Sequence, residues 1–288
     1  MPDAPSTRPL PSPAPTRPVR KDEIELVDRG IYIESTLPER RSRRKPLLFV
    51  HGELAGSWVW ERWLQHFAAR GWEGHAVNLR NHYWSQAAEA SSLSFESYTD
   101  DVGAAMDRLG PDVVGIGHGM GALLLLKALE RHSASALVLL SPELPADLRR
   151  PAQPHELRDV PDVYGKERLG WSTLIEKIVR DERDLSLDEV RRIQHLLGQK
   201  PRESGRARRQ VIAGIPVDRG AVGARPILVV GARFDRLVAE SDSERLAEWL
   251  GAEYEPFAAH SHYGLLLSEA GSPQVAETVR GFLEAHRL

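Results

Sequence analysis

Apolar residues alternate with polar ones near the start of the chain and gather in continuous runs further on. The alternation on either side of Asp28-Arg-Gly30, in residues 23–27 and 31–34, predicts a β-hairpin. The continuous runs are typical of strands buried on both faces of a parallel sheet. These runs occupy residues 46–50, 75–79, 112–117, 136–140 and 226–231, and residues 253–257 are predicted as one more short strand.

Segments with helical periodicity separate these strands. Helices are predicted over residues 60–70, 95–109, 120–131 and 273–286. Strands that alternate with helices of this length indicate βαβ units. The predicted fold class is therefore α/β, with a doubly wound, mostly parallel sheet.

The alternation stops after Glu143 and resumes at Pro226. The residues between are helical in pattern and contain no apolar run of the sheet type. Ser186-Leu-Asp-Glu189 forms a capping box that opens an amphipathic helix through Leu197. Such an insertion is most simply a cap over the carboxyl ends of the strands, where open α/β sheets bind ligands. The predicted division is a core of residues 23–143 and 225–288 and a helical cap of residues 144–224.

The first residues of the chain have a different composition. Seven of the first 20 residues are proline, mixed with Ser, Thr, Ala and Arg. Such a segment buries too little apolar surface to offset the entropy of ordering it. Residues 1–22 are therefore predicted to form a disordered Pro-rich tail, and a proline-rich docking ligand is the alternative.

Composition and charge exclude several classes of function. The net charge of -3 gives no overall bias toward nucleic acid, and the basic runs at 40–45 and 206–209 are interpreted as solvated surface. The chain has no cysteine, which removes disulfides, thiolate catalysis and most structural zinc sites. No apolar run has the length of a membrane helix, and no secretory signal is visible. We expect a cytoplasmic protein with no metal, cofactor, nucleic-acid or membrane partner, and an oligomer is compatible with the sequence.

Five stretches in a fixed order, each after a strand-like run, resemble the α/β-hydrolase family. The similarity is greatest to bacterial esterase-like and lysophospholipase-like members that carry a cap, and it extends from about residue 23 to the end. The stretches are His51-Gly52, Val77–His82, Gly117–Gly121, Gly231–Val238 and Phe257–His262.

The resemblance implies a nucleophile, an acid and a base in this chain order. The matching positions are 119, Asp235 and His262, and His260 is the alternative base. In Gly-x-Ser-x-Gly elbows the serine lies on a sharp turn between strand and helix, but here Gly119 occupies that position. The chain therefore cannot form an acyl-enzyme at the place where the family forms one.

The other elements of the family's site do not require a serine. The backbone N–H groups of Met120 and Glu53 are expected to form an oxyanion hole. The ligand is expected to be a small, apolar or aromatic molecule. The residues expected to contact it are His51, His118, Trp58, Tyr164, Trp171 and Tyr263.

Four functions remain open at this stage. The first is an enzyme in which His262 and Asp235 act as a general base on water or directly on a substrate proton, giving hydrolysis or a lyase, cyclase or isomerase step. The second is a non-catalytic pseudo-hydrolase that binds a ligand or partner. The third is a serine esterase whose nucleophile has been replaced. The fourth is a dinucleotide-binding protein, because Gly117–Ala122 fits Gly-x-Gly-x-x-Gly/Ala and Glu143 follows the next strand.

Overall fold

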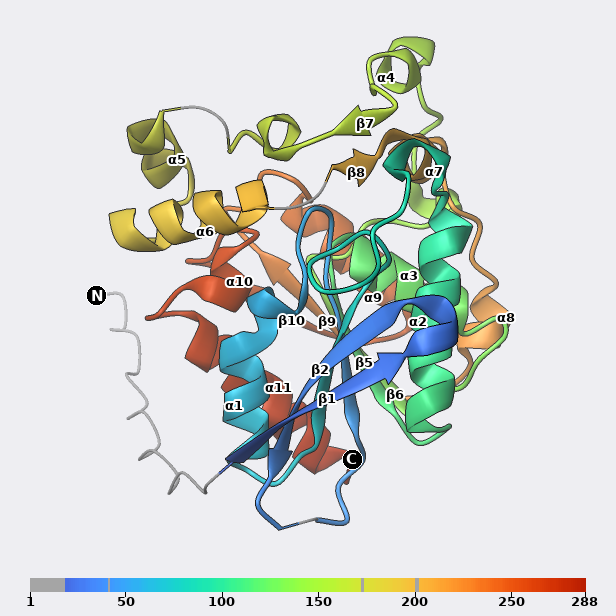
Figure 1. Ribbon diagram of the computed structural model, residues 1–288, viewed down its shortest axis with the longest axis vertical. Helices are drawn as coiled ribbons and strands as arrows, with labels where there is room; N and C mark the ends of the chain where they lie inside the picture. Colours follow the sequence, from blue (N-terminus) through green and yellow to red (C-terminus); the bar gives the residue numbers. More distant parts are fainter. Residues whose placement is uncertain (1–18, 41, 172–173, 200–201) are drawn as a thin grey trace, which may run out of the picture.

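The computed structural model describes residues 19–40, 42–171, 174–199 and 202–288, and its centre is an eight-stranded sheet (Figure 1). The strands, in chain order, are β1 (Val19–Leu26), β2 (Ile31–Pro38), β3 (Leu47–Val50), β4 (Gly74–Asn78), β5 (Val114–His118), β6 (Ala136–Leu140), β9 (Ile227–Ala232) and β10 (Glu253–Phe257). Their order across the sheet is β1-β2-β4-β3-β5-β6-β9-β10.

Strands β1 and β2 form the predicted hairpin, with Ile24 opposite Ile33, and β2 pairs antiparallel to β4. All pairs from β4 to β10 are parallel. The prediction of a mostly parallel sheet is confirmed. Strand β1 begins at Val19, so residues 19–22 belong to the hairpin and not to the predicted tail. The rest of that tail, residues 1–18, lies outside the described residues.

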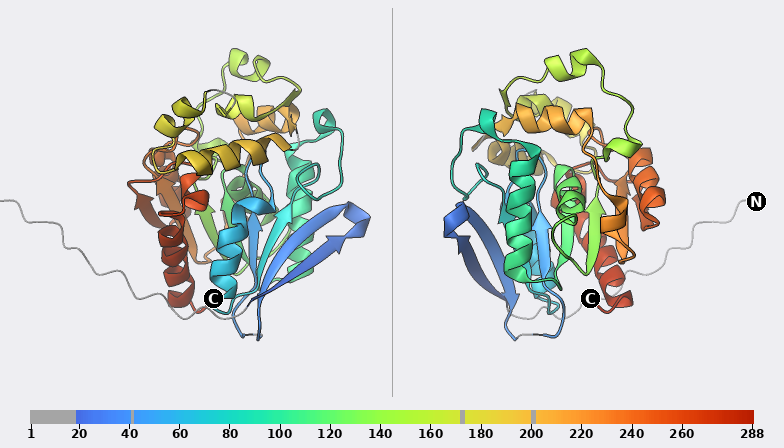
Figure 2. Two further views of the ribbon diagram at one scale, coloured as in Figure 1. Left: turned by 60° about the vertical axis from the view of Figure 1, so that its left-hand side comes forward. Right: turned by 90° about the vertical axis from the view of Figure 1, so that its right-hand side faces the viewer.

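Helices cover both faces of the sheet (Figures 1 and 2). Side chains of a strand alternate between the faces, so Leu47 and Phe49 of β3 join one apolar cluster, whereas Leu48 and Val50 join the other. The first cluster includes residues of α1 (Glu61–Ala68) and α11 (Ser272–Ala285). The second includes residues of α2 (Phe95–Leu109), α3 (Met120–Ala128) and α9 (Glu240–Leu250).

The inserted segment lies across the edge of the sheet where the parallel strands end (Figure 2). Its elements there are α4 (Pro154–Arg158), β7 (Val163–Tyr164), α5 (Ile175–Asp181), α6 (Leu187–Gln199), β8 (Glu203–Ser204) and α7 (Gly205–Ala213). The last helix before β9, α8 (Arg219–Val222), lies instead near the C-terminal end of α3, where Lys127 donates to Pro216 (Figure 1). The backbone N–H of Ser186 donates to Glu189, and the N–H of Glu189 donates to the Ser186 hydroxyl, so the predicted capping box is present. The cap side chains Trp171, Ile178 and Val190 belong to the same apolar cluster as α1 and α11.

The antiparallel ladder between β7 and β8 was not predicted. Each strand has only two residues, which is too short for an alternation to show in the sequence.

Gly121 is a position where the backbone of α3 closely approaches β3. A Cβ placed on Gly121 would lie 2.4 Å from the carbonyl oxygen of Val50 and 2.5 Å from that of His51. Because neither backbone atom moves easily, we expect Gly121→Ala to lower the free energy of unfolding by about 1–3 kcal/mol. Urea denaturation measures this change. Gly281→Ala is the control, since nothing lies within 4 Å of its Cβ position and alanine favours the helix by about 1 kcal/mol. Equal effects of the two substitutions would contradict the close approach.

Candidate active site

Gly119 forms a sharp turn between β5 and α3. Its backbone angles are φ 56° and ψ -120°, in a region that costs a residue with a side chain about 1–3 kcal/mol. A Cβ placed on Gly119 would lie 3.4 Å from Nε2 of His262 and 4.0 Å from the Cα of Gly52. A side chain at position 119 would therefore meet the imidazole directly.

His262 and Asp235 form a hydrogen-bonded pair beside this turn. Asp235 follows β9 and His262 follows β10, so neighbouring parallel strands bring them together. Nδ1 of His262 lies 2.7 Å from Oδ2 of Asp235. The backbone N–H groups of Leu237 and Val238 donate to Oδ1 of Asp235 over 2.7 and 2.8 Å. These contacts fix the carboxylate and leave Nε2 of His262 facing position 119.

The interaction between Asp235 and His262 shifts the pKa values of both groups. Burial raises the pKa of Asp235, but the charge and hydrogen bond of His262, together with the two backbone donors, outweigh it and lower the pKa overall. Burial lowers the pKa of His262, but Asp235, with Glu182 and Glu143 nearby, outweighs that effect and raises it overall.

The two other histidines expected near the site have structural contacts. Nε2 of His118 lies 3.0 Å from the carbonyl oxygen of His262, and burial lowers the pKa of His118 well below its usual value. The neutral ring therefore donates to that carbonyl and holds the backbone of His262. His51 accepts from the N–H of Leu79 at Nε2, and its Nδ1 lies 2.7 Å from the carbonyl oxygen of Gly52. His51 thus joins the ends of β3 and β4.

His260, the alternative base, lies elsewhere. Its ring packs edge-on against Phe257 at 5.1 Å between centroids, and its Nε2 is the atom closest to the Cβ position of Gly271. In the described part of the chain, neither ring nitrogen of His260 has a hydrogen-bond partner. The structure thus places His262, and not His260, beside Gly119.

A cavity of about 50 Å³ adjoins Gly119, and we call it the catalytic cavity. It is lined by Gly52, Glu53, Ala55, His118, Gly119, Met120, Glu143, Leu169, Arg208, Leu237, Val238, His262 and Tyr263. Besides Gly119 and His262, four residues expected at the site are among them: Glu53, Met120, His118 and Tyr263. Three of the lining residues, Glu53, Glu143 and Arg208, carry a carboxyl or guanidinium group, whereas mainly aromatic contacts were expected from the sequence.

The other expected contacts, His51, Trp58, Tyr164 and Trp171, do not line the catalytic cavity. Trp171 lies behind Tyr263, with the two rings perpendicular at 5.3 Å. The hydroxyl of Tyr164 faces the carboxyl of Glu53. Their aromatic rings belong to the apolar contact between cap and core, which the sequence pattern does not separate from a ligand contact.

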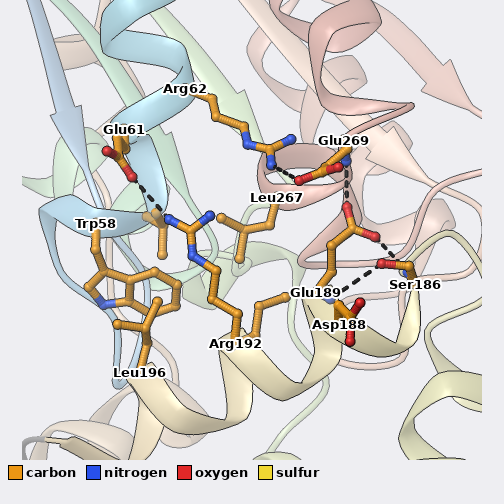
Figure 3. Close-up of a pocket in the computed structure, with 12 residues that line it drawn as sticks. Trp58, Glu61, Arg62, Ser186, Asp188, Glu189, Arg192, Leu196, Leu267 and Glu269 are labelled. Carbon is orange, nitrogen blue, oxygen red and sulfur yellow. Dashed lines mark hydrogen bonds and ion pairs between the residues drawn. The ribbon is translucent and has the colours of Figure 1, made fainter.

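Trp58 lines a second cavity of about 330 Å³ between α1 and the cap helix α6 (Figure 3). Two ion pairs lie at this cavity. Arg192 of the cap pairs with Glu61 of the core at 3.0 Å, and Arg62 pairs with Glu269 within the core. Neither Asp235 nor His262 lies on its wall.

Arg208 is a site residue that the sequence did not indicate. Its run, residues 206–209, was interpreted as solvated surface, and that is wrong for Arg208, whose guanidinium lies in the catalytic cavity. Nη1 of Arg208 contacts Glu53 at 2.9 Å and Glu143 at 2.5 Å. Glu143 also pairs with Arg149. No local pattern carries this signal, because the partners are 155 and 65 residues away from Arg208.

A buried ion pair joins the cap to the core beside the cavity. Nε2 of His82 lies 3.0 Å from Oε2 of Glu203 in β8, and both side chains are almost completely buried. Glu203 also accepts from the hydroxyl of Tyr98 at 2.6 Å and from the N–H of Leu54 at 2.9 Å. Leu54 follows Glu53, so this contact from the cap holds the loop that provides one wall of the catalytic cavity.

The strand order, the turn at position 119 and the loops after β9 and β10 that carry Asp235 and His262 belong to a known fold. A family model of the alpha/beta hydrolase fold matches residues 45–175. The chain is an α/β-hydrolase-fold protein. In the described part of the chain, no helix combines the length and apolar character needed to cross a membrane.

Solved structures with the same fold include enzymes of several kinds. An esterase from Thermogutta terrifontis is similar with a TM-score of 0.68 and 18% identity, over 92% of this chain and 98% of that chain. A bromoperoxidase from Bacillus anthracis has a TM-score of 0.69 and 14% identity, over 92% and 100%. An esterase from Exiguobacterium antarcticum has a TM-score of 0.65 and 20% identity, over 91% and 98%. No curated protein matches the sequence.

Proposed function

We propose that this protein is an enzyme in which His262, oriented by Asp235, acts as a general base on a small molecule in the catalytic cavity. The distance of 3.4 Å between Nε2 of His262 and the Cβ position of Gly119 carries the proposal. The base faces a space that a serine side chain fills in the family's elbow. A water molecule or a substrate C–H group in that space would lose its proton to Nε2.

The negative charge formed by this proton transfer needs stabilisation. Met120 is the first residue of α3, and Glu53 follows the end of β3, and both line the catalytic cavity. We assign their backbone N–H groups to the developing oxyanion. The positive end of α3 adds to this effect, because a helix N-terminus favours negative charge.

The dinucleotide alternative has no support from the geometry. Glu143, which would have to bind a ribose, forms ion pairs with Arg208 and Arg149. Four statements remain predictions from the sequence: a cytoplasmic location, a small-molecule ligand, independence of cofactors and the possibility of an oligomer.

Replacing the base tests the proposal. We expect His262→Ala to lower turnover about 100-fold, the lower range for a general base. The probes are p-nitrophenyl acetate, whose hydrolysis reports on attack by water, and 2-butanone in D2O, whose deuterium uptake reports on C–H abstraction. Turnover by the intact protein should rise with pH and reach half its maximum above 6.5, because the pKa of His262 is raised and only the neutral ring accepts a proton.

His260→Ala is the matched control, because it removes a buried histidine two positions away that does not face Gly119. Circular dichroism shows whether both variants fold. If both substitutions lower turnover equally, or if His262→Ala has no effect, His262 is not the base.

A binding protein is the second candidate, since Gly119 offers no nucleophile and the cavity is small. In that case the intact protein accelerates neither probe beyond free imidazole at the same concentration. A ligand bound by such a protein would be released by Arg208→Ala, because Arg208 is the cation in the wall of the cavity.

A further inference from the structure

Glu53 lies in the wall of the catalytic cavity, which His262 also lines. Its side chain is only 10% exposed. It follows Gly52, whose Cα lies 4.0 Å from the Cβ position of Gly119. The cavity of about 50 Å³ has room for only about three to five water-sized groups at 10–15 Å³ each. One small molecule in this space would therefore touch both His262 and Glu53.

Glu53 and Glu143 have different surroundings, which shift their pKa values in opposite directions. One nitrogen of Arg208 bridges both carboxyl groups, but Glu143 has Arg149 as a second cation. The two arginines outweigh burial and lower the pKa of Glu143. Burial raises the pKa of Glu53, and the nearby carboxyl groups of Glu143 and Glu203 raise it further. The attraction of Arg208 lowers it but does not offset these effects. Pairs of carboxyl groups driven apart in this way often divide acid and base roles.

The position of Glu53 is fixed from the cap. The next residue, Leu54, has a φ of 55°, which is uncommon for a residue with a branched side chain. Its N–H donates over 2.9 Å to Glu203, which lies in the cap strand β8. Strained backbone that neighbouring contacts hold in place is common at functional sites.

We propose that Glu53 is the proton donor that works opposite His262, and that the substrate is a small carbonyl compound with a removable C–H group next to its carbonyl. This inference rests on the proposed function, because it needs His262 as the base. It selects proton transfer at carbon over hydrolysis as the main reaction.

The step is balanced without another reactant. Nε2 of His262 takes the proton from the carbon next to the carbonyl, and the C–H electron pair forms a carbon–carbon double bond. The π pair of the carbonyl forms an O–H bond with the proton of Glu53. Glu53 becomes a carboxylate 2.9 Å from Arg208, which stabilises its charge. Return of a solvent-derived deuteron from His262 to the same carbon, with return of the enol proton to Glu53, gives isotope exchange. Where that carbon carries a hydroxyl group, the enediol can take the proton at the former carbonyl carbon instead, which gives an isomer.

Two measurements on the same variants test this proposal: the titration of Glu53 and the rate of deuterium uptake. In protein with carboxyl-labelled [13C]glutamate, NMR follows each glutamate against pH, and Glu53→Gln identifies the signal of Glu53. In D2O, proton NMR follows deuterium uptake by 2-butanone. We expect the Glu53 signal to titrate above 4.5, Glu53→Gln to slow uptake about 100-fold and Glu53→Asp to recover part of it.

A structural role of Glu53 would not change the form of the pH profile. Uptake by the intact protein should rise and then fall with pH, because it needs neutral His262 and protonated Glu53 together, and Glu53→Gln should remove the fall and leave a rise to a plateau. Glu61→Gln is the control, because Glu61 forms a cap–core ion pair outside the catalytic cavity and its loss should leave uptake unchanged.

The outcomes separate the two proposals. Loss of uptake in His262→Ala but not in Glu53→Gln would overturn the role of Glu53 and leave the general base in place. A Glu53 signal that titrates at or below 4.5 would overturn the donor role whatever the activity. No uptake by the intact protein, with hydrolysis of p-nitrophenyl acetate still dependent on His262, would overturn the carbonyl C–H substrate class alone.

Discussion

Gly119→Ser is expected to react covalently with a fluorophosphonate and to hydrolyse p-nitrophenyl acetate at least about a thousandfold faster than the unchanged protein. The serine Cβ would lie 3.4 Å from Nε2 of His262, within the range from which Oγ reaches the imidazole. Removal of the serine from a complete triad costs about a million-fold in turnover, so its addition beside the proposed base, acid and oxyanion donors should recover much of that factor. Mass spectrometry measures the adduct, and absorbance measures hydrolysis.

Gly119→Ala is the matched control, because it has the same backbone cost of about 1–3 kcal/mol at a φ of 56° and lacks the hydroxyl. Both variants should lose stability equally, and only the serine should react. This result would favour the interpretation of the chain as a serine esterase scaffold with its nucleophile replaced. A folded Gly119→Ser that does not react would show that the oxyanion donors no longer match an acyl group.

The second large effect concerns Glu203. We expect Glu203→Ala to lower the free energy of unfolding by about 3–5 kcal/mol, because it leaves the buried His82 without its partner. The substitution also removes the acceptor of the Tyr98 hydroxyl and of the Leu54 N–H. Urea denaturation measures the loss. Glu61→Gln, which breaks an exposed pair with Arg192, should cost less than about 1 kcal/mol.

The loss of unfolding free energy in Glu203→Ala should depend on pH. The charge and hydrogen bonds of His82 overcome burial and lower the pKa of Glu203 from 4.5 to about 2, so its contribution is complete above 4.5 and disappears as the pH falls toward 2. The pKa of His82 is raised above 6.5 by Glu203 against burial, so its contribution is complete below 6.5 and is lost at higher pH. The difference between the intact protein and Glu203→Ala should be largest between 4.5 and 6.5. A difference independent of pH would contradict a charged pair.

The core could be predicted from the sequence because its strands and helices have strong local patterns. The runs at 46–50 and 136–140 became β3 and β6 almost residue for residue. Asp235 and His262 could be named because the stretches that contain them resemble the α/β-hydrolase pattern and each follows a predicted strand. The turn at Gly119 was found in the same way.

The sequence predicted only part of the wall of the site, because the rest depends on contacts between distant parts of the chain. Arg208 stands in a basic run that resembles an exposed helix face, and only the fold brings it to Glu53 and Glu143. Trp171 was expected at the ligand, but it fills the contact between cap and core behind Tyr263. Composition alone does not distinguish an aromatic residue that packs from one that binds.

The shared apolar cluster of cap and core has a consequence for how molecules enter. Trp171, Ile178 and Val190 pack in one continuous interior with α1 and α11. Swinging the cap away as a rigid lid would expose this interior to water at about 25 cal/mol for each Å² of apolar surface. Entry is therefore expected through small local openings around the rim, and the two layers should melt in a single transition.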